Sequence, residues 1–250
     1  GSNLAILTDL LAYAAHTSAF NANMVASEMF LDTAQIRKNV VSRAKELGYT
    51  PSSRTAAKAT FDLTVNNPTV GGQTPSSLTI NRGHEFTTVF DGSSFTFISL
   101  ENKTITPTTG TFVFNDLTIN QGKLTSDIYR YSSQVSNQRF PMLNTNIDTS
   151  TININVTSNN IVTSWTKAGD LTGIKSSSKV YYLQENDEGL FEVYFGDGVI
   201  GASPKDGDEI SISYLVTDNL HANGANVFSM ATSINGNSDV TFTNTISASA

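Results

Sequence analysis

The stretch that decides the fold is FEVYFGDGVIGASPKDGDEISISYLV, residues 191–216. An apolar run ends at Phe195, Gly-Asp-Gly follows at 196–198, and apolar residues then occupy every second position from Ile210 to Val216. Because glycine adopts backbone angles that a Cβ resists, the stretch predicts two strands joined by tight turns. Gly-Asp-Gly also occurs in phosphate-binding and calcium-binding loops, so this segment bears on whether the chain is an enzyme or a building block.

A period of two recurs along the chain from about residue 57, with Thr, Ser and Asn between the apolar positions. Such short alternating segments, separated by turn residues, predict antiparallel strands that bury one face. We therefore expect a mainly antiparallel β region of sandwich or barrel type over residues 56–250, with two subdomains at about 56–145 and 146–250 as an option. Strands that alternate with helices would indicate a parallel sheet, and the sequence does not show that alternation. The clearest alternating segments are 61–65, 95–97, 112–114, 152–156 and 180–182.

Residues 1–55 have a helical period instead and predict a helical segment ahead of the β region. The first helix is expected at about 3–30, and Asp9 and Glu28 are its only charged residues. A helix on the surface of a monomer normally has a charged face, so this one predicts cover on several sides, in part by a partner. The candidate subunit-interface residues are Leu7, Leu10, Leu11, Phe20 and Met24.

A second helix is expected at about 33–47, which makes the fold class α+β. Asp32 is in position to cap this helix, and Gln35 completes a capping box. Gly48 suits the position after the last turn, and Pro51 prevents the helix from restarting. The predicted apolar stripe of the helix is Ile36, Val40, Ala44 and Leu47.

The composition excludes several kinds of partner. The chain has 250 residues and a formal net charge of −7, which divides into +2 over residues 1–60 and −9 over the remainder. The acidic remainder repels nucleic acid and anionic lipid, because phosphate binding requires clustered cations. No apolar run reaches the roughly 18 residues of a membrane-spanning helix, and the absence of cysteine excludes disulfides and thiolate metal sites. We predict no nucleic acid, membrane or small-molecule partner.

Catalytic and metal-binding motifs are missing from the sequence. His16, His84 and His221 lack ligand spacing, and neither His-Glu-x-x-His nor Gly-x-Ser-x-Gly occurs. The Gly-Asp-Gly turn lacks the lysine and the following helix of a phosphate-binding loop. We therefore predict no enzyme activity, no catalytic residue, no cofactor and no metal site.

An acidic run between residues 185 and 209 is the best candidate for chemistry. Two of its carboxylates could serve glycoside hydrolysis, or several could bind calcium. Its Asp-Gly pairs are typical turn formers, however, and the spacing of an EF-hand loop is not met, so a structural role is the favoured interpretation. The structural turn motif is Gly196, Asp197, Gly198, Gly201, Pro204 and Gly207. The acidic residues of the run are Glu185, Asp187, Glu188, Glu192, Asp197, Asp206, Asp208 and Glu209.

Two blocks near the ends of the chain indicate one family. Their segments are LLAY at 10–13, NANM at 21–24, ASEMFLD at 26–32, AKELGYTP at 44–51, FEVYFGDG at 191–198 and Asn223-Gly224. Taken in order, these segments resemble the baseplate wedge proteins of T-even-like contractile-tailed phages, within the baseplate J-like family. Residues 66–180 carry little of this signature. Because members of the family are longer, the resemblance implies a fragment of a full-length protein, which agrees with Gly1-Ser2 as a cloning scar.

The resemblance implies a structural virion protein. Such a protein is a subunit of the tail baseplate and forms the wedge and the ring around the tail hub by protein–protein association. The resemblance also implies a homo-oligomer, with a pair of copies in each wedge, and contacts with other baseplate wedge proteins largely through helices. Assembly is expected in the host cytoplasm, and the family has no catalytic residues to transfer.

Two other functions stay open at this point. Strand aromatics could form the platform of a carbohydrate-binding or polysaccharide-degrading β module of a phage tail, although at alternate positions they more often belong to a core. Trp165 is likewise expected in a buried or rim position. A calcium-stabilised adhesin would instead melt at a temperature that depends on metal. The aromatics in question are Phe86, Phe90, Phe95, Phe97, Tyr129 and Tyr131.

Overall fold

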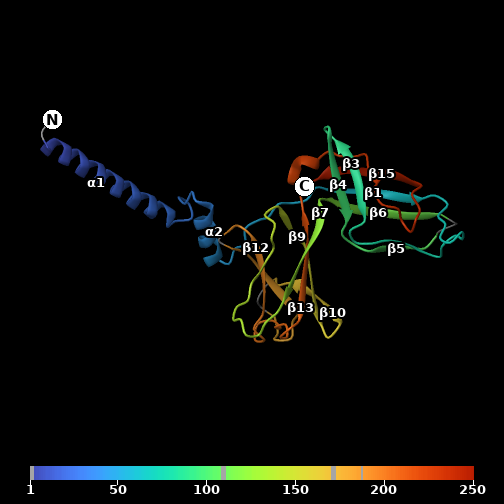
Figure 1. Ribbon diagram of the computed structural model, residues 1–250. Helices are drawn as coiled ribbons and strands as arrows, with labels where there is room; N and C mark the ends of the chain where they lie inside the picture. Colours follow the sequence, from blue (N-terminus) through green and yellow to red (C-terminus); the bar gives the residue numbers. More distant parts are fainter. Residues whose placement is uncertain (1–2, 108–110, 170–172, 187) are drawn as a thin grey trace.

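The computed structural model describes residues 3–107, 111–169, 173–186 and 188–250. Figure 1 shows a long helix that projects from a body of β-strands, in which two main sheets adjoin. The projecting helix is α1 (Asn3–Glu28), and α2 (Arg37–Glu46) lies at its base beside the body. The predicted order, a long N-terminal helix followed by mainly antiparallel strands, is therefore confirmed.

The first main sheet has six strands in the order β14-β3-β4-β6-β1-β15. The predicted alternation places its apolar residues inward, so that on β1 every second residue from Ala59 to Val65 is buried. Phenylalanine rings fill this core, and Phe61 lies edge-on to Phe86 and Phe242 at centroid distances of 5.5 and 4.9 Å. The strands are β1 (Lys58–Val65), β3 (Glu85–Phe90), β4 (Ser93–Ser99), β6 (Phe112–Gln121), β14 (Ser229–Met230) and β15 (Val240–Ser249), with a separate pair β2 (Leu78–Ile80) and β5 (Lys103–Ile105).

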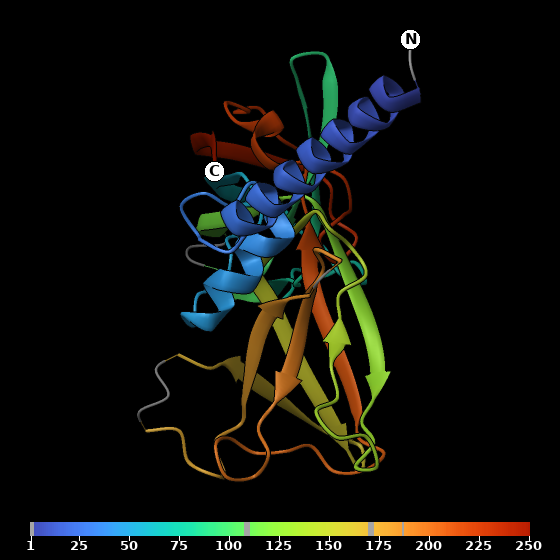
Figure 2. The same cartoon turned by 90° about the vertical axis from the view of Figure 1, so that its left-hand side faces the viewer.

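The second main sheet has seven strands in the order β7-β13-β9-β10-β11-β12-β8. The sheet curls in a barrel-like way (Figure 2), and its two edges are linked where the Tyr129 hydroxyl donates a hydrogen bond to the Pro141 carbonyl. One pairing departs from the antiparallel expectation, because β10 and β11 are parallel at Lys167 and Tyr181. Residues 168–179 separate these strands, which is long enough for a crossover connection. The strands are β7 (Lys123–Arg130), β8 (Phe140–Pro141), β9 (Ile147–Ser158), β10 (Ile161–Lys167), β11 (Val180–Glu185), β12 (Phe191–Phe195) and β13 (Glu209–Val216).

The second sheet is an insertion in the first. The chain enters it at Gly122 and leaves it near Thr217, just before the short 3-10 helix η1 (Asn219–Ala222). Gln121 joins the two crossings, because its side-chain oxygen accepts hydrogen bonds from the Thr217 hydroxyl at 2.6 Å and from the Asp218 N–H at 2.9 Å. The chain thus passes from one sheet to the other at these two points and not near residue 145. Pairing between strands that are distant in sequence decides to which sheet each strand belongs.

The strand aromatics that suggested a sugar-binding platform pack in the two cores. Trp165 is buried as well, and its ring lies edge-on to Phe195 at 4.9 Å. Packing in a core is the more common role of such rings, and it accounts for the position of this set. Phe86 and Phe97 are buried, and Phe90, Phe95, Tyr129 and Tyr131 are partly buried against the cores.

The second helix begins later than the sequence predicts. α2 starts at Arg37, its N-cap residue is Ile36, and that residue makes no side-chain capping bond. The predicted start at 33 with Asp32 as the cap is therefore wrong. The apolar stripe is also displaced, because the side of α2 that meets the body buries Val41 and Ala44 and leaves Leu47 77% exposed. No helix in the described part of the chain combines the length and hydropathy that crossing a membrane requires.

Candidate assembly surfaces

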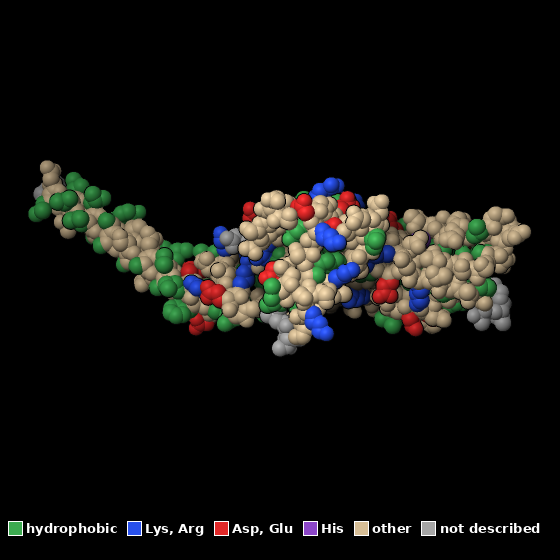
Figure 3. Space-filling view, turned by 90° about the horizontal axis from the view of Figure 1, so that it is seen from below, with side chains coloured by type: hydrophobic (Ala, Val, Ile, Leu, Met, Phe, Trp, Pro, Cys, Tyr) green, Lys and Arg blue, Asp and Glu red, His purple; other side chains and the backbone are tan. Residues whose placement is uncertain are grey.

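α1 is exposed along its whole length. None of its residues is buried, and Leu10, Leu11 and Phe20 are each 62% exposed. Figure 3 shows apolar side chains along the visible face of this arm. A large apolar surface in water is typical of an element that docks on a partner, because its burial contributes about 25 cal/mol per Å². All the candidate interface residues lie on this surface: Leu7, Leu10, Leu11, Phe20 and Met24.

A carboxylate at the end of α1 fixes the bend into α2. Glu28 accepts hydrogen bonds from the backbone N–H groups of Gln35 at 2.9 Å and Ile36 at 3.3 Å, and from the Asn39 side chain at 2.8 Å. The Asn39 amide, followed by the Gln35 N–H, lowers the pKa of Glu28. These bonds satisfy donors at the start of α2, the place where Asp32 was expected to act. The capping-box pattern misses Glu28, because this acceptor lies seven and eight residues upstream of its donors.

An ion pair ties α2 to the second sheet. The Arg37 guanidinium binds both carboxylate oxygens of Glu185 at the end of β11, with an Nη2–Oε2 distance of 2.8 Å. The Glu185 side chain is 1% exposed, whereas that of Arg37 is 62% exposed. The hydrogen bond to Glu185 raises the pKa of Arg37. A buried carboxylate without a cation is unfavourable, so Glu185 depends on Arg37.

Replacement of Arg37 by Met is expected to lower the free energy of unfolding by about 2–3 kcal/mol, because Glu185 stays buried without its charge-assisted hydrogen bonds. Urea denaturation measures this loss. The control is Arg54→Met at an exposed arginine in the linker, which should change the free energy by less than about 0.5 kcal/mol. An equally small change in Arg37→Met would contradict the role of the ion pair.

The Gly-Asp-Gly corner between β12 and β13 is closed by its own backbone. The Gly198 N–H donates to the Gly201 carbonyl at 3.0 Å. The Asp197 carboxylate accepts hydrogen bonds from the N–H groups of Val199 at 2.9 Å and Ile200 at 3.0 Å, and the Ile200 bond, followed by the Val199 bond, lowers the pKa of Asp197. One oxygen of Asp197 is thereby engaged within the turn itself.

The second turn of the motif packs against the end of β7. Pro204 is buried, and the Gly207 N–H donates to the Tyr131 carbonyl at 2.9 Å. The Lys205 N–H donates to the Asp208 carboxylate at 2.8 Å. Gly207 has a φ of +81°, a backbone angle that favours glycine. The turn residues thus bring the start of β13 beside β7, with which it pairs.

Gly196 is required by space and not by its backbone angle. A Cβ at this position would lie 2.4 Å from the carbonyl oxygens of both Ile200 and Gly201. Gly196→Ala is therefore expected to open the corner and to lower the free energy of unfolding by about 1–3 kcal/mol. Gly169→Ala is the control, because a Cβ there would meet nothing within 4 Å. Thermal denaturation compares the two variants, and equal melting temperatures would contradict the close approach at Gly196.

The other acidic residues of the 185–209 run make separate local contacts. Asp206 accepts a backbone N–H at 2.8 Å, and Glu192 accepts a hydrogen bond from the side-chain amide of Gln184. Asp187 lies outside the described residues. Within residues 3–107, 111–169, 173–186 and 188–250, no group of three or more His, Asp or Glu side chains is placed to hold a metal ion.

A buried aspartate that the sequence does not single out holds the linker after the helices. Asp148, which is 1% exposed, accepts hydrogen bonds from the Ala56 N–H at 2.8 Å and from the Ser150 N–H at 2.9 Å. In the alternating segment of β9, an aspartate resembles a strand residue that faces solvent. No sequence signal therefore marks Asp148 as functional. Its role becomes visible only when the structure places the linker beside it.

The seven-stranded sheet corresponds to a known family pattern. Residues 127–218 match the family model for the third domain of the bacteriophage baseplate wedge protein gp6. This range runs from β7 to just beyond β13, so it coincides with the second sheet as its hydrogen bonds define it. The predicted resemblance to phage baseplate wedge proteins is thereby confirmed.

A relative extends the likeness over nearly the whole chain. The baseplate wedge protein gp6 of Enterobacteria phage T4 is 29% identical over 251 residues, which cover 92% of this chain. They cover 36% of that protein, so the chain spans about a third of the length of this relative. The likeness therefore reaches well beyond the seven-stranded sheet.

Proposed function

We propose that this chain is a structural subunit of a contractile-tail baseplate, where it helps to form the wedge and the ring around the tail hub. The observation that carries the proposal is the likeness to gp6 of phage T4 over 92% of the chain. Its role is association and not catalysis. The turn motif at 196–207 serves as a structural corner, and the protein resides in the virion tail baseplate after assembly in the host cytoplasm.

The helical segment, residues 1–55, is the proposed docking unit, and the β region from residue 56 is the body. Leu7, Leu10, Leu11, Phe20 and Met24 are the proposed contacts of α1 with a second copy of this chain and with other wedge proteins. Exposure of apolar residues along the whole helix supports more than one neighbour, because a single partner covers one stripe. The proposed unit is a pair of copies in each wedge, as the resemblance to baseplate wedge proteins implies.

Native mass spectrometry of the chain, mixed with the other tail proteins of its source, tests this function. We expect stable complexes of fixed stoichiometry that contain two copies of the chain. Polysaccharide turnover by the isolated chain, or the absence of any complex, would overturn the proposal. A melting temperature that falls on addition of a metal chelator would instead support the calcium-stabilised alternative.

A further inference from the structure

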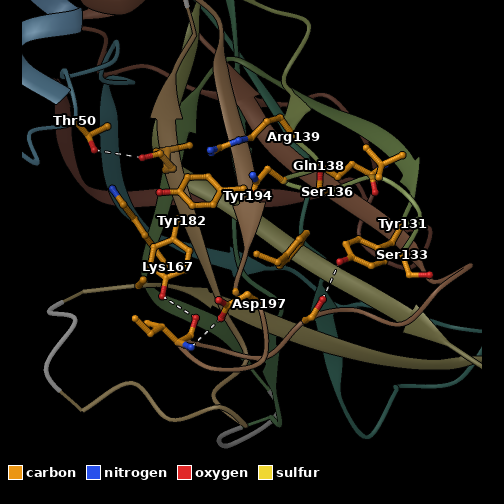
Figure 4. A pocket seen from close by; sticks show the side chains of 18 of the residues that line it. Thr50, Tyr131, Ser133, Ser136, Gln138, Arg139, Lys167, Tyr182, Tyr194 and Asp197 are labelled. Carbon is orange, nitrogen blue, oxygen red and sulfur yellow. Dashed lines mark hydrogen bonds between the residues drawn. The ribbon is translucent and has the colours of Figure 1, made fainter. Parts of the chain in front are cut away.

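The second sheet carries a groove that the proposed function does not use. Its volume is about 830 Å³, and it is bounded by the segment that follows α2, the loop before β8 and the Gly-Asp-Gly corner (Figure 4). Its charged lining residues are Arg139, Lys167 and Asp197. The groove is thus net positive in a chain whose formal net charge is −7.

Three lining side chains form a row across neighbouring strands. Tyr182 on β11 and Tyr194 on β12 are paired directly across the strands, and their rings stack at a centroid distance of 5.1 Å with 22° between their planes. The guanidinium of Arg139, which precedes β8, lies 3.9 Å from the centroid of the Tyr194 ring. Because β12 lies between β11 and β8, Tyr182 and Arg139 cover opposite faces of Tyr194.

This row suits an anion better than a sugar ring. A sugar stacks on a free aromatic face, and both faces of Tyr194 are occupied. A guanidinium that lies flat on a ring keeps its N–H donors at its edge, where they match the two oxygens of a carboxylate. Among the described residues, no carboxylate forms an ion pair with Arg139 or Lys167. The two cations therefore lack an acidic partner within the described chain.

We propose that this groove binds an acidic segment of a partner polypeptide. One carboxylate is held by Arg139, and a second acidic side chain reaches Lys167 at the end of β10. Neighbouring strands lie about 4.8 Å apart, so β8 and β10 are separated by about 14 Å, a span that calls for a ligand with several negative charges. Asp197 repels carboxylates from the corner side and so restricts the segment to the line between the two cations. This inference rests on the proposed scaffolding function and identifies one partner by its acidic segment.

Fluorescence anisotropy with a labelled hexaglutamate peptide tests the site. We expect the unmodified chain to bind the peptide with an affinity that falls as salt is added. Arg139→Gln should weaken binding about tenfold or more, because a bidentate charge-assisted contact is lost. Arg139→Lys should also weaken binding, since lysine lacks the planar fork. Arg54→Gln, at an exposed arginine outside the groove, should bind like the unmodified chain.

Three outcomes would overturn the proposal: no binding of hexaglutamate, equal binding by Arg139→Gln, or preference for polygalacturonate, an acidic polysaccharide, over the peptide. Tyr194→Leu provides a second variant, because loss of the stacking ring frees the guanidinium and should weaken binding as well. Circular dichroism confirms that each variant is folded. Wedge complexes seen by native mass spectrometry can persist through α1 when the peptide site fails, so the two proposals fail separately.

Discussion

Replacement of both Leu10 and Phe20 by glutamate is expected to abolish association through α1. Both side chains are 62% exposed in the single chain, so the substitutions leave the β body intact. In an assembled state they would be buried, and each apolar side chain then contributes about 1.5–3 kcal/mol. Loss of both, together with two carboxylates that resist desolvation, corresponds to association at least about a thousandfold weaker.

Sedimentation velocity, on the chain alone and with its wedge partners, measures this effect. The matched control replaces two exposed valines of the body by glutamate, Val89 and Val199, which are 74% and 72% exposed. This control carries the same added charge and should associate like the unmodified chain. If the Leu10 and Phe20 variant still forms complexes of unchanged stoichiometry, α1 is not the docking surface.

Phe61→Ala is expected to lower the free energy of unfolding by about 3–5 kcal/mol. Phe61 is fully buried on β1 between neighbouring strands of the first sheet. Its ring contacts Phe86, Phe242 and Phe228, the last at a centroid distance of 5.7 Å. Removal of the ring leaves a cavity that these neighbours cannot fill without leaving their own positions.

Urea denaturation followed by circular dichroism measures the loss in Phe61→Ala. Phe61→Leu keeps most of the volume and should cost less than the alanine variant. Val89→Ala removes an exposed side chain from the same sheet and should change stability by less than about 0.5 kcal/mol. A loss below about 1 kcal/mol in Phe61→Ala would show that the first core is not packed around this ring.

The arm is joined to the body through charged contacts in series. Glu28 links α1 to the start of α2, and Arg37 links α2 to Glu185 in the second sheet. Asp148 then holds the linker at Ala56, close to the start of the first sheet. Each of these contacts depends on one carboxylate, so the direction in which α1 projects rests on a few named side chains together with the buried Val41 and Ala44 of α2.

Local sequence patterns account for the elements that depend on nearest neighbours. The alternation around Phe61, Ile154 and Ile212 predicts strands, because a period of two places one side of each strand in a core. The nearly uncharged run from Asn3 to Glu28 predicts a helix that needs cover. The prediction fails at Asp32, since α2 begins only at Arg37 and the Glu28 carboxylate instead binds the N–H groups of Gln35 and Ile36 just before it.

Of the two candidate surfaces, one can be found from the sequence and the other cannot. The five apolar contacts proposed on α1 can be found from the sequence, because a helix without a charged face is visible in its composition. The row of Arg139, Tyr194 and Tyr182 cannot, because its members come from a loop and two strands whose order in the sheet is unknown beforehand. The ion pair of Glu185 cannot be found from the sequence either, since its partner Arg37 lies 148 residues away.

The sequence by itself determined the helical arm, the strand periodicity and the tight corner at 196–201, because each follows from backbone preference and from the spacing of apolar residues along a short segment. Only the tertiary structure decided that the second sheet is inserted in the first, that β10 and β11 run parallel, and that Arg139 lies against a tyrosine stack in a groove that Lys167 also lines. These features arise from hydrogen bonds and packing between residues far apart in the chain, and no local pattern records which distant strand will be the neighbour.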